Sequence, residues 1–133
     1  MTVRVYLSGP MTGRPDLNFP AFTAAATQLR AAGFEVVNPA ELVTTPGTPY
    51  GECMRIDIAA LVTCQALAQL PDWSESRGAG VEFAVARAIG MRVGSVDGFL
   101  KASSPVDLTV DGSAPAPARA GAGVLSSDER GNA

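Results

Sequence analysis

Residues 3–13 read Val-Arg-Val-Tyr-Leu-Ser-Gly-Pro-Met-Thr-Gly, an apolar run that passes directly into a loop containing Gly and Pro. Such a run, bounded by Gly and Pro, is typical of a β-strand that ends in a tight turn. The sequence therefore predicts a first strand at residues 3–7 and a loop over residues 8–18, in which Asn18 and Pro20 mark the start of a helix.

Helices and strands alternate along the chain from this point. The expected elements are helix 21–32, strand 34–37, helix 51–62, strand 66–70, helix 78–89 and strand 92–96. Alternation of this kind predicts a parallel sheet with right-handed crossovers. We expect a small flavodoxin- or Rossmann-like α/β fold with strand order 2-1-3-4 and helices on both faces. Ligands of such sheets bind beyond the carboxyl ends of the strands.

Composition narrows the chemistry that the chain can perform. Its 133 residues carry a net charge of −3, two cysteines and no histidine. A Ser-His-Asp device or a zinc site of His and Cys is therefore excluded, and we expect no metal and no cofactor. Without a Lys/Arg cluster or a long apolar run, we expect no nucleic-acid polymer and no membrane as partner, and a cytoplasmic location. Cys53 and Cys64 are interpreted as core residues.

The C-terminal part of the sequence differs from the rest. Ala, Gly, Pro and Ser make up more than half of residues 102–133. Such a composition buries too little apolar surface to offset the entropy of ordering. We expect one domain over residues 1–100 and a flexible tail over residues 101–133. Because this domain is small for an α/β sheet, a homodimer that covers one face is expected.

Asp57 is a carboxylate within an apolar helical stripe. It shares this stripe with Cys53, Ala60 and Cys64. A carboxylate in such a position is costly unless it has a partner, which makes Asp57 a candidate catalytic residue. The alternative is a structural Asp at the edge of the buried face, bonded to a loop amide.

Glu82 is a second carboxylate on the expected core side of a helix, with Val85, Ala86 and Ile89 on the same face. It follows a Gly-containing stretch that includes Ser76, Gly78 and Gly80. The free N–H groups of a helix start attract anions, so a phosphate could bind at these residues. The alternative is a Ser76 cap with glycines that pack against the sheet.

Other candidate substrate-binding residues follow the expected strands. The first loop offers Ser8, Gly9, Pro10, Met11 and Gly13, and the later loops offer Asn38 and Trp73. The first loop lacks the lysine of a nucleoside triphosphate P-loop. Tyr6 could reach the site with its hydroxyl or be a core tyrosine, and Trp73 could stack on a base or pack over the core.

Three motifs together resemble the nucleoside 2-deoxyribosyltransferase-like family. Residues 6–13 resemble its opening Tyr-x-x-Gly-x-x-x-Gly loop, and residues 76–82 resemble the Ser-x-Gly-x-Gly-x-Glu stretch of its deoxynucleoside monophosphate N-glycosidase members. Asp57 precedes Glu82 by 25 residues, which is similar to the family's Asp-to-Glu spacing. The resemblance covers about residues 3–97 and is nearest to short bacterial and phage members. Pro10 departs from the N-glycosidase pattern and removes one backbone donor.

The resemblance implies cleavage or transfer of the N-glycosidic bond of a nucleoside or nucleoside 5′-monophosphate. Glu82 would attack the anomeric carbon, Asp57 would orient the sugar or protonate the leaving base, and Tyr6 would position Glu82 or the sugar. The two Gly-containing stretches would hold the 5′ end. A carboxylate suits this chemistry because it stabilises an oxocarbenium-like centre.

Two other function classes remain open from the sequence. One is a nucleotide-binding module without catalysis, and the other is a structural dimer domain without a ligand. Glu82 discriminates best between an enzyme and a binding module, because binding alone does not require a carboxylate at the sugar carbon. The structural domain leaves both Asp57 and Glu82 without a role.

Overall fold

The computed structural model describes residues 2–43 and 45–102. Four parallel strands form one sheet in the order β2-β1-β3-β4, which confirms the expected α/β fold and strand order. The strands are β1 (Arg4–Ser8), β2 (Glu35–Val37), β3 (Ala66–Gln69) and β4 (Arg92–Ser95). The expected tail, apart from its first two residues, lies outside the described residues.

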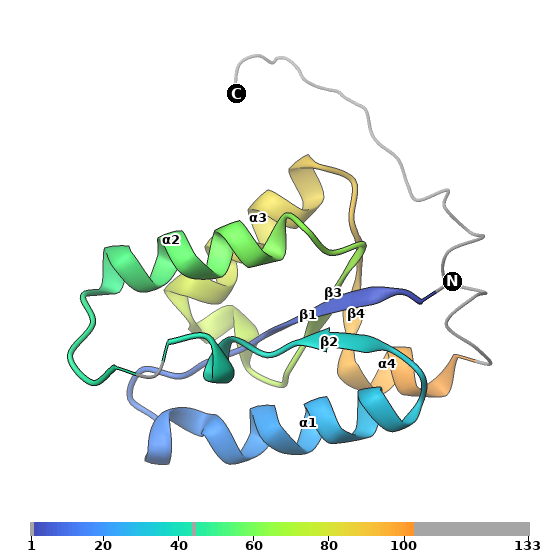
Figure 1. The fold of residues 1–133 in the computed structure, drawn as a ribbon, viewed down its shortest axis with the longest axis horizontal. Helices are drawn as coiled ribbons and strands as arrows, with labels where there is room; N and C mark the ends of the chain where they lie inside the picture. Colours follow the sequence, from blue (N-terminus) through green and yellow to red (C-terminus); the bar gives the residue numbers. More distant parts are fainter. Residues whose placement is uncertain (1, 44, 103–133) are drawn as a thin grey trace.

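Helices cover both faces of the sheet, as the sequence predicts (Figure 1). They are α1 (Phe19–Ala31), α2 (Tyr50–Leu61), α3 (Arg77–Ala88) and α4 (Val96–Lys101). Helices α1 and α4 lie on one side, and α2 and α3 on the other. No helix of the described ranges is long and apolar enough to cross a membrane.

The two faces have separate cores because successive side chains of a strand point in opposite directions. Val5 and Leu7 of β1 join the core under α1 and α4, where the rings of Phe34 and Phe99 meet edge to face at 5.9 Å. Tyr6 joins the core under α2 and α3 instead. The side of the sheet that faces α2 and α3 therefore receives the polar end of a tyrosine.

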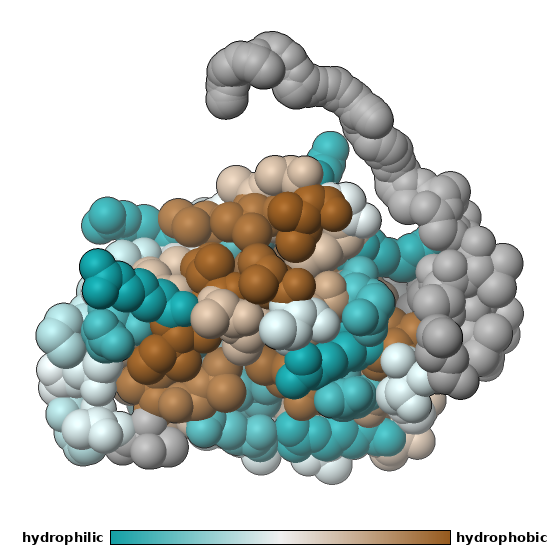
Figure 2. Space-filling view, turned by 45° about the horizontal axis from the view of Figure 1, so that its top comes forward, coloured by the Kyte–Doolittle hydropathy of each residue, from teal (hydrophilic) through white to brown (hydrophobic). Residues whose placement is uncertain are grey.

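Helix α2 packs more loosely than the other long helices. Leu61 is its one buried residue, and the remaining apolar side chains of the helix are at least partly exposed. Val62, which follows α2, and Val81 and Ile89, in and after α3, are also exposed. Figure 2 shows apolar residues gathered over this side of the molecule. This α2–α3 patch is a surface that a second protein could cover.

The sequence interpretation misses α4 and extends β4 by one residue. Val96 begins the helix, and the Ser95 hydroxyl caps it by accepting a hydrogen bond from the Gly98 N–H. A helix of six residues that contains a glycine gives almost no periodic signal. The expectation for Ile89 is also wrong, because its side chain is 52% exposed and not on the core side.

The loops at the carboxyl edge of the sheet contain short 3-10 turns: η1 (Pro15–Asn18) after β1, η2 (Pro39–Glu41) after β2 and η3 (Trp73–Glu75) after β3. Asn18 does occupy the position before α1, but its side chain donates to the Pro10 carbonyl and does not cap the helix. The Arg14 guanidinium bridges the loops after β1 and β3 by pairing with Asp72 and Glu75.

Replacing Gly9 with Ala should destabilise the fold. A Cβ atom at Gly9 would lie 2.8 Å from the Leu70 Cβ, so the backbone of one strand end would have to move. We expect a loss of about 1–3 kcal/mol in the free energy of unfolding, measured with urea. Gly80→Ala is the matched control, because its Cβ would meet no atom within 4 Å and a helical Gly→Ala change adds up to about 1 kcal/mol. Equal effects of the two changes would contradict this account.

Candidate active site

Glu82 is held between two hydroxyl groups of β1. The Tyr6 hydroxyl donates to Glu82 Oε2 and the Ser8 hydroxyl donates to Glu82 Oε1, each at 2.7 Å. Tyr6 and Ser8 are two residues apart on the strand, so both side chains point to the face that α3 covers. Glu82 is 5% exposed, while Tyr6 and Ser8 are fully buried. The structure thus fixes a carboxylate at the carboxyl end of the central strand β1.

Burial changes the acid–base properties of this group. Desolvation raises the pKa of Glu82 to about 7; the hydrogen bonds from Ser8 and Tyr6 act in the opposite direction, and the charge of Asp57 adds to the rise. Burial and the nearby Glu82 and Asp57 carboxylates raise the pKa of Tyr6 well above its usual range, so Tyr6 remains a hydrogen-bond donor. Glu82 therefore exchanges its proton near neutral pH.

Asp57 lies on α2, on the same side of the sheet as Glu82. Desolvation raises the pKa of its carboxyl to about 6. Asp57 Oδ1 is buried and has no hydrogen-bond partner in the described chain. The charge of Asp57 raises the pKa values of Tyr6 and Glu82, so these three residues lie close together and are called the carboxylate cluster below. No loop amide bonds to Asp57 Oδ1, although the structural alternative expects one. Two carboxyls with raised pKa values on one face are typical of a functional site.

Two buried amides belong to the same edge of the sheet. Asn38 is 2% exposed, and its Oδ1 accepts from the Ala40 N–H at the start of η2. Gln69 is 9% exposed, and the sequence interpretation overlooks it because it ends an apolar strand. The side-chain nitrogens of Asn38 and Gln69 have no hydrogen-bond partner within 3.5 Å among the described residues. A polar residue at the carboxyl end of a buried strand is the signal that could have identified Gln69.

The stretch before Glu82 begins α3. The Ser76 hydroxyl accepts from the Ala79 N–H and is the N-cap, which is the structural role considered for it. Gly78 faces α2, because a Cβ there would lie 3.4 Å from Met54 Sδ and 3.6 Å from the Tyr50 hydroxyl. Gly80 borders open space, but its N–H donates to the Ser76 carbonyl and the residue lies on the side of α3 opposite Glu82.

Some residues of the first loop pack against the protein, and others are exposed. Gly9 packs against Leu70 and Pro10 is buried, with its carbonyl bonded to Asn18. Met11 packs against the core under α1 and α4, so its side chain points away from Glu82. Gly13 is exposed and has a φ of +81°, a backbone angle that favours glycine.

Trp73 is half-buried in η3 at the end of β3. Its ring packs on Phe83 of α3, with the ring centroids 4.9 Å apart and tilted by 46°. The Arg87 guanidinium lies over the Phe83 ring, 5.6 Å from its centroid. The packing role considered for Trp73 is therefore present.

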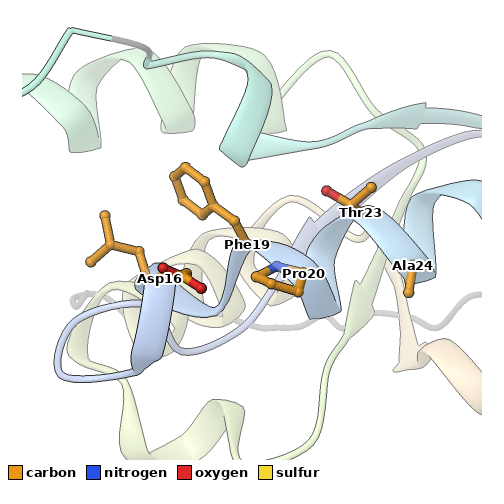
Figure 3. Close-up of a pocket in the computed structure, with 6 residues that line it drawn as sticks. Asp16, Phe19, Pro20, Thr23 and Ala24 are labelled. Carbon is orange, nitrogen blue, oxygen red and sulfur yellow. The ribbon is translucent and has the colours of Figure 1, made fainter.

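A separate pocket lies at the start of α1 (Figure 3). It is open and shallow, and its lining residues are Asp16, Leu17, Phe19, Pro20, Thr23 and Ala24. None of the residues of the carboxylate cluster lines it. No group of three or more His, Cys, Asp or Glu residues that could hold a metal lies within the described ranges.

Comparison with known proteins places the chain in a family. No curated protein matches it. Residues 3–95 match the family model described as a domain of unknown function, DUF4406, and this match covers the whole sheet and all residues of the carboxylate cluster. The match spans well over half of the sequence, and the chain therefore belongs to the DUF4406 family.

Proposed function

We propose that this protein cleaves the N-glycosidic bond of a nucleoside or nucleoside 5′-monophosphate, with Glu82 as the nucleophile. The observation that supports this most is the fixed carboxylate: Tyr6 and Ser8 hold both oxygens of Glu82 at the carboxyl end of β1. A buried carboxylate is costly to the fold, and two neutral hydroxyl donors offset this cost only in part, so a catalytic role explains why Glu82 is kept. The resemblance of residues 6–13 and 76–82 to the nucleoside 2-deoxyribosyltransferase-like family points to the same chemistry.

In the first step, a Glu82 oxygen forms a bond to the anomeric carbon while the bond from that carbon to the base nitrogen breaks. The electron pair of the broken bond moves to the base, which takes a proton from Asp57. The carboxylate stabilises the positive charge that develops on the sugar, and the product is a glycosyl ester of Glu82. Tyr6 and Ser8 keep the Glu82 carboxylate oriented throughout.

In the second step, an acceptor attacks the anomeric carbon and Glu82 leaves. Asp57, now ionised, takes the proton of the acceptor. Water as acceptor gives hydrolysis, and a second base gives transfer of the sugar. The first turn of α3, whose N–H groups form the anion-binding end of a helix just before Glu82, suits the 5′-hydroxyl or 5′-phosphate of the substrate.

A homodimer is part of the proposal. The α2–α3 patch, which includes Val62, Val81 and Ile89, supports it because exposed apolar residues that gather on one face are a common site for contact with a second subunit (Figure 2). The proposal includes neither a metal nor a cofactor, since two carboxyls suffice for both steps.

Incubation with a panel of nucleosides and their 5′-monophosphates tests the proposed function directly. The full-length protein should release free base from at least one member, which chromatography detects. Addition of a second base would show transfer as a new nucleoside. Binding of a panel member without any release of base would favour the nucleotide-binding module instead.

The rate of base release should depend on pH as a bell with its maximum between about pH 6 and 7. Reaction requires Glu82 ionised and Asp57 protonated, and the two pKa values are raised to about 7 and about 6. The coupled pair therefore holds one proton in this window, both protons below it and none above it. Because the pKa of Glu82 is the higher one, this proton is mainly on Glu82; the reactive form, with the proton on Asp57, is the minor one, and its population follows the same bell. Initial rates from pH 4.5 to 9 measure the profile, and a flat profile would contradict the assignment.

Tyr6→Phe gives a control for this profile. The hydrogen bond from Tyr6 lowers the pKa of Glu82, so its loss should move the bell to higher pH as well as reduce its height. A purely structural role of Tyr6 would reduce the rate without moving the profile.

A further inference from the structure

Gln69 is a buried amide that the mechanism above does not use. Its neighbours in the chain, Ala68 of β3 and the following Leu70, belong to the core under α1 and α4, whereas Leu67 belongs to the core under α2 and α3. Alternation along the strand therefore directs the Gln69 side chain to the face of Leu67. This is the face on which Glu82 lies.

The register of the sheet brings Gln69 beside Ser8, the residue that holds Glu82. Gln69 pairs with Ser8 of β1, and the Ser8 hydroxyl contacts Glu82 at 2.7 Å. On its other side Gln69 pairs with Ser95 of β4, whose hydroxyl caps α4. Both neighbouring hydroxyls thus have partners, and the Gln69 side-chain nitrogen has none among the described residues.

An unsatisfied amide N–H₂ that is nine-tenths buried carries a desolvation cost that a ligand acceptor would remove. We propose that Gln69 donates a hydrogen bond to the 2′-hydroxyl of the substrate, so that this protein acts on ribosyl compounds and differs in its sugar from the deoxynucleoside-cleaving members that its motifs resemble. The inference rests on the proposed function, because it takes Glu82 as the group that meets the anomeric carbon.

Two positions support the 2′-hydroxyl over an atom of the base. The 2′-hydroxyl is attached to the carbon next to the anomeric centre, and Gln69 is next to the serine that holds the nucleophile. Asp57, the proton donor to the base, comes from α2 and not from the sheet. The base accordingly lies toward α2 and the sugar toward the end of β3. Hydrogen bonds to this hydroxyl strengthen in the transition state of glycoside cleavage.

The test compares ribosyl and 2′-deoxyribosyl members of the same panel, with the same base and the same 5′ group. The wild-type protein should favour the ribosyl member in kcat/KM by about tenfold or more. Gln69→Met keeps the length of the side chain and removes the amide, so it should lower kcat/KM for the ribosyl member about 10- to 100-fold and change the deoxyribosyl value little. Gln28→Met, on the exposed face of α1, is the matched control and should change neither value.

Gln69→Asn provides a second variant that keeps a polar side chain if the Met variant folds poorly. The side chain of Asn is one methylene shorter, so its amide no longer reaches the sugar and the ribosyl preference should again decrease. The melting temperature of the variant checks that the fold is intact. A wild-type preference for the deoxyribosyl member, or equal losses for both sugars in the variants, would overturn the assignment of Gln69 and leave the proposed function standing. Failure to release base from any member would overturn both.

Discussion

Glu82→Gln should lower kcat for base release by about 1,000-fold or more while the affinity for the substrate changes little. The amide keeps the size of the carboxylate but cannot attack the anomeric carbon or balance the charge that develops there. Loss of a nucleophile acts on the transition state, so kcat falls much more than binding. Single-turnover release of base, together with calorimetric binding of the same substrate, measures the two effects separately.

The control for this variant is Glu52→Gln. Glu52 is an exposed carboxylate of α2 whose ion pair with Arg55 is 3.9 Å long, so the change removes a charge from the surface only. It should leave kcat and affinity unaltered. Full activity of Glu82→Gln would refute the nucleophile assignment outright, and equal loss of activity in both variants would point to a general effect of charge.

The order of strands and helices could be predicted from the sequence because it depends on local patterns that repeat along the chain. The apolar strands, the helices between them and the handedness of crossovers predict a parallel sheet, and helices on both faces then place β2 and β3 on opposite sides of β1. The short helix α4 was not predicted because tertiary packing of Val96 and Phe99 stabilises it. Periodicity over six residues cannot reveal such packing.

The candidate site was accessible only in part. Burial of Glu82 follows from the apolar residues around it on α3, and its closeness to Asp57 follows from two helices on one face of the sheet. The bond between Ser8 and Glu82 does not follow, because it depends on the rotation of α3 over β1. Gln69 could not be placed beside Ser8 before the register of β1 and β3 was known.

The different roles of the candidate loop residues have the same origin. Sequence shows that Gly9 and Gly78 are glycines, but not whether a ligand or a protein atom lies where the Cβ would be. The structure places Leu70 beside Gly9 and Met54 beside Gly78. At Gly13 and Gly80, in contrast, no protein atom lies within 4 Å of that position.

The stability of the protein should also record the burial of Glu82, independently of any substrate. Burial raises the pKa of this carboxyl from an ordinary value of 4.5 to about 7, so the folded state favours the protonated form. The contribution of the protonated Glu82 to the free energy of unfolding is therefore fully present below about pH 4.5, and it is lost as the pH rises through 7. The shift corresponds to about 3 kcal/mol at pH 8.5, since each pKa unit is worth about 1.4 kcal/mol.

Glu82→Gln removes this titration and so tests it. The difference in free energy of unfolding between the variant and the wild type should grow in favour of the variant by about 3 kcal/mol between pH 4.5 and pH 8.5, measured by urea unfolding at each pH. Glu52→Gln, with its exposed carboxylate, should show a difference that changes little with pH. If the difference in free energy of unfolding for Glu82→Gln also stayed constant with pH, burial would not destabilise the ionised Glu82 carboxylate. Gain of stability together with loss of turnover is the pattern expected of a residue retained for catalysis at a cost to the fold.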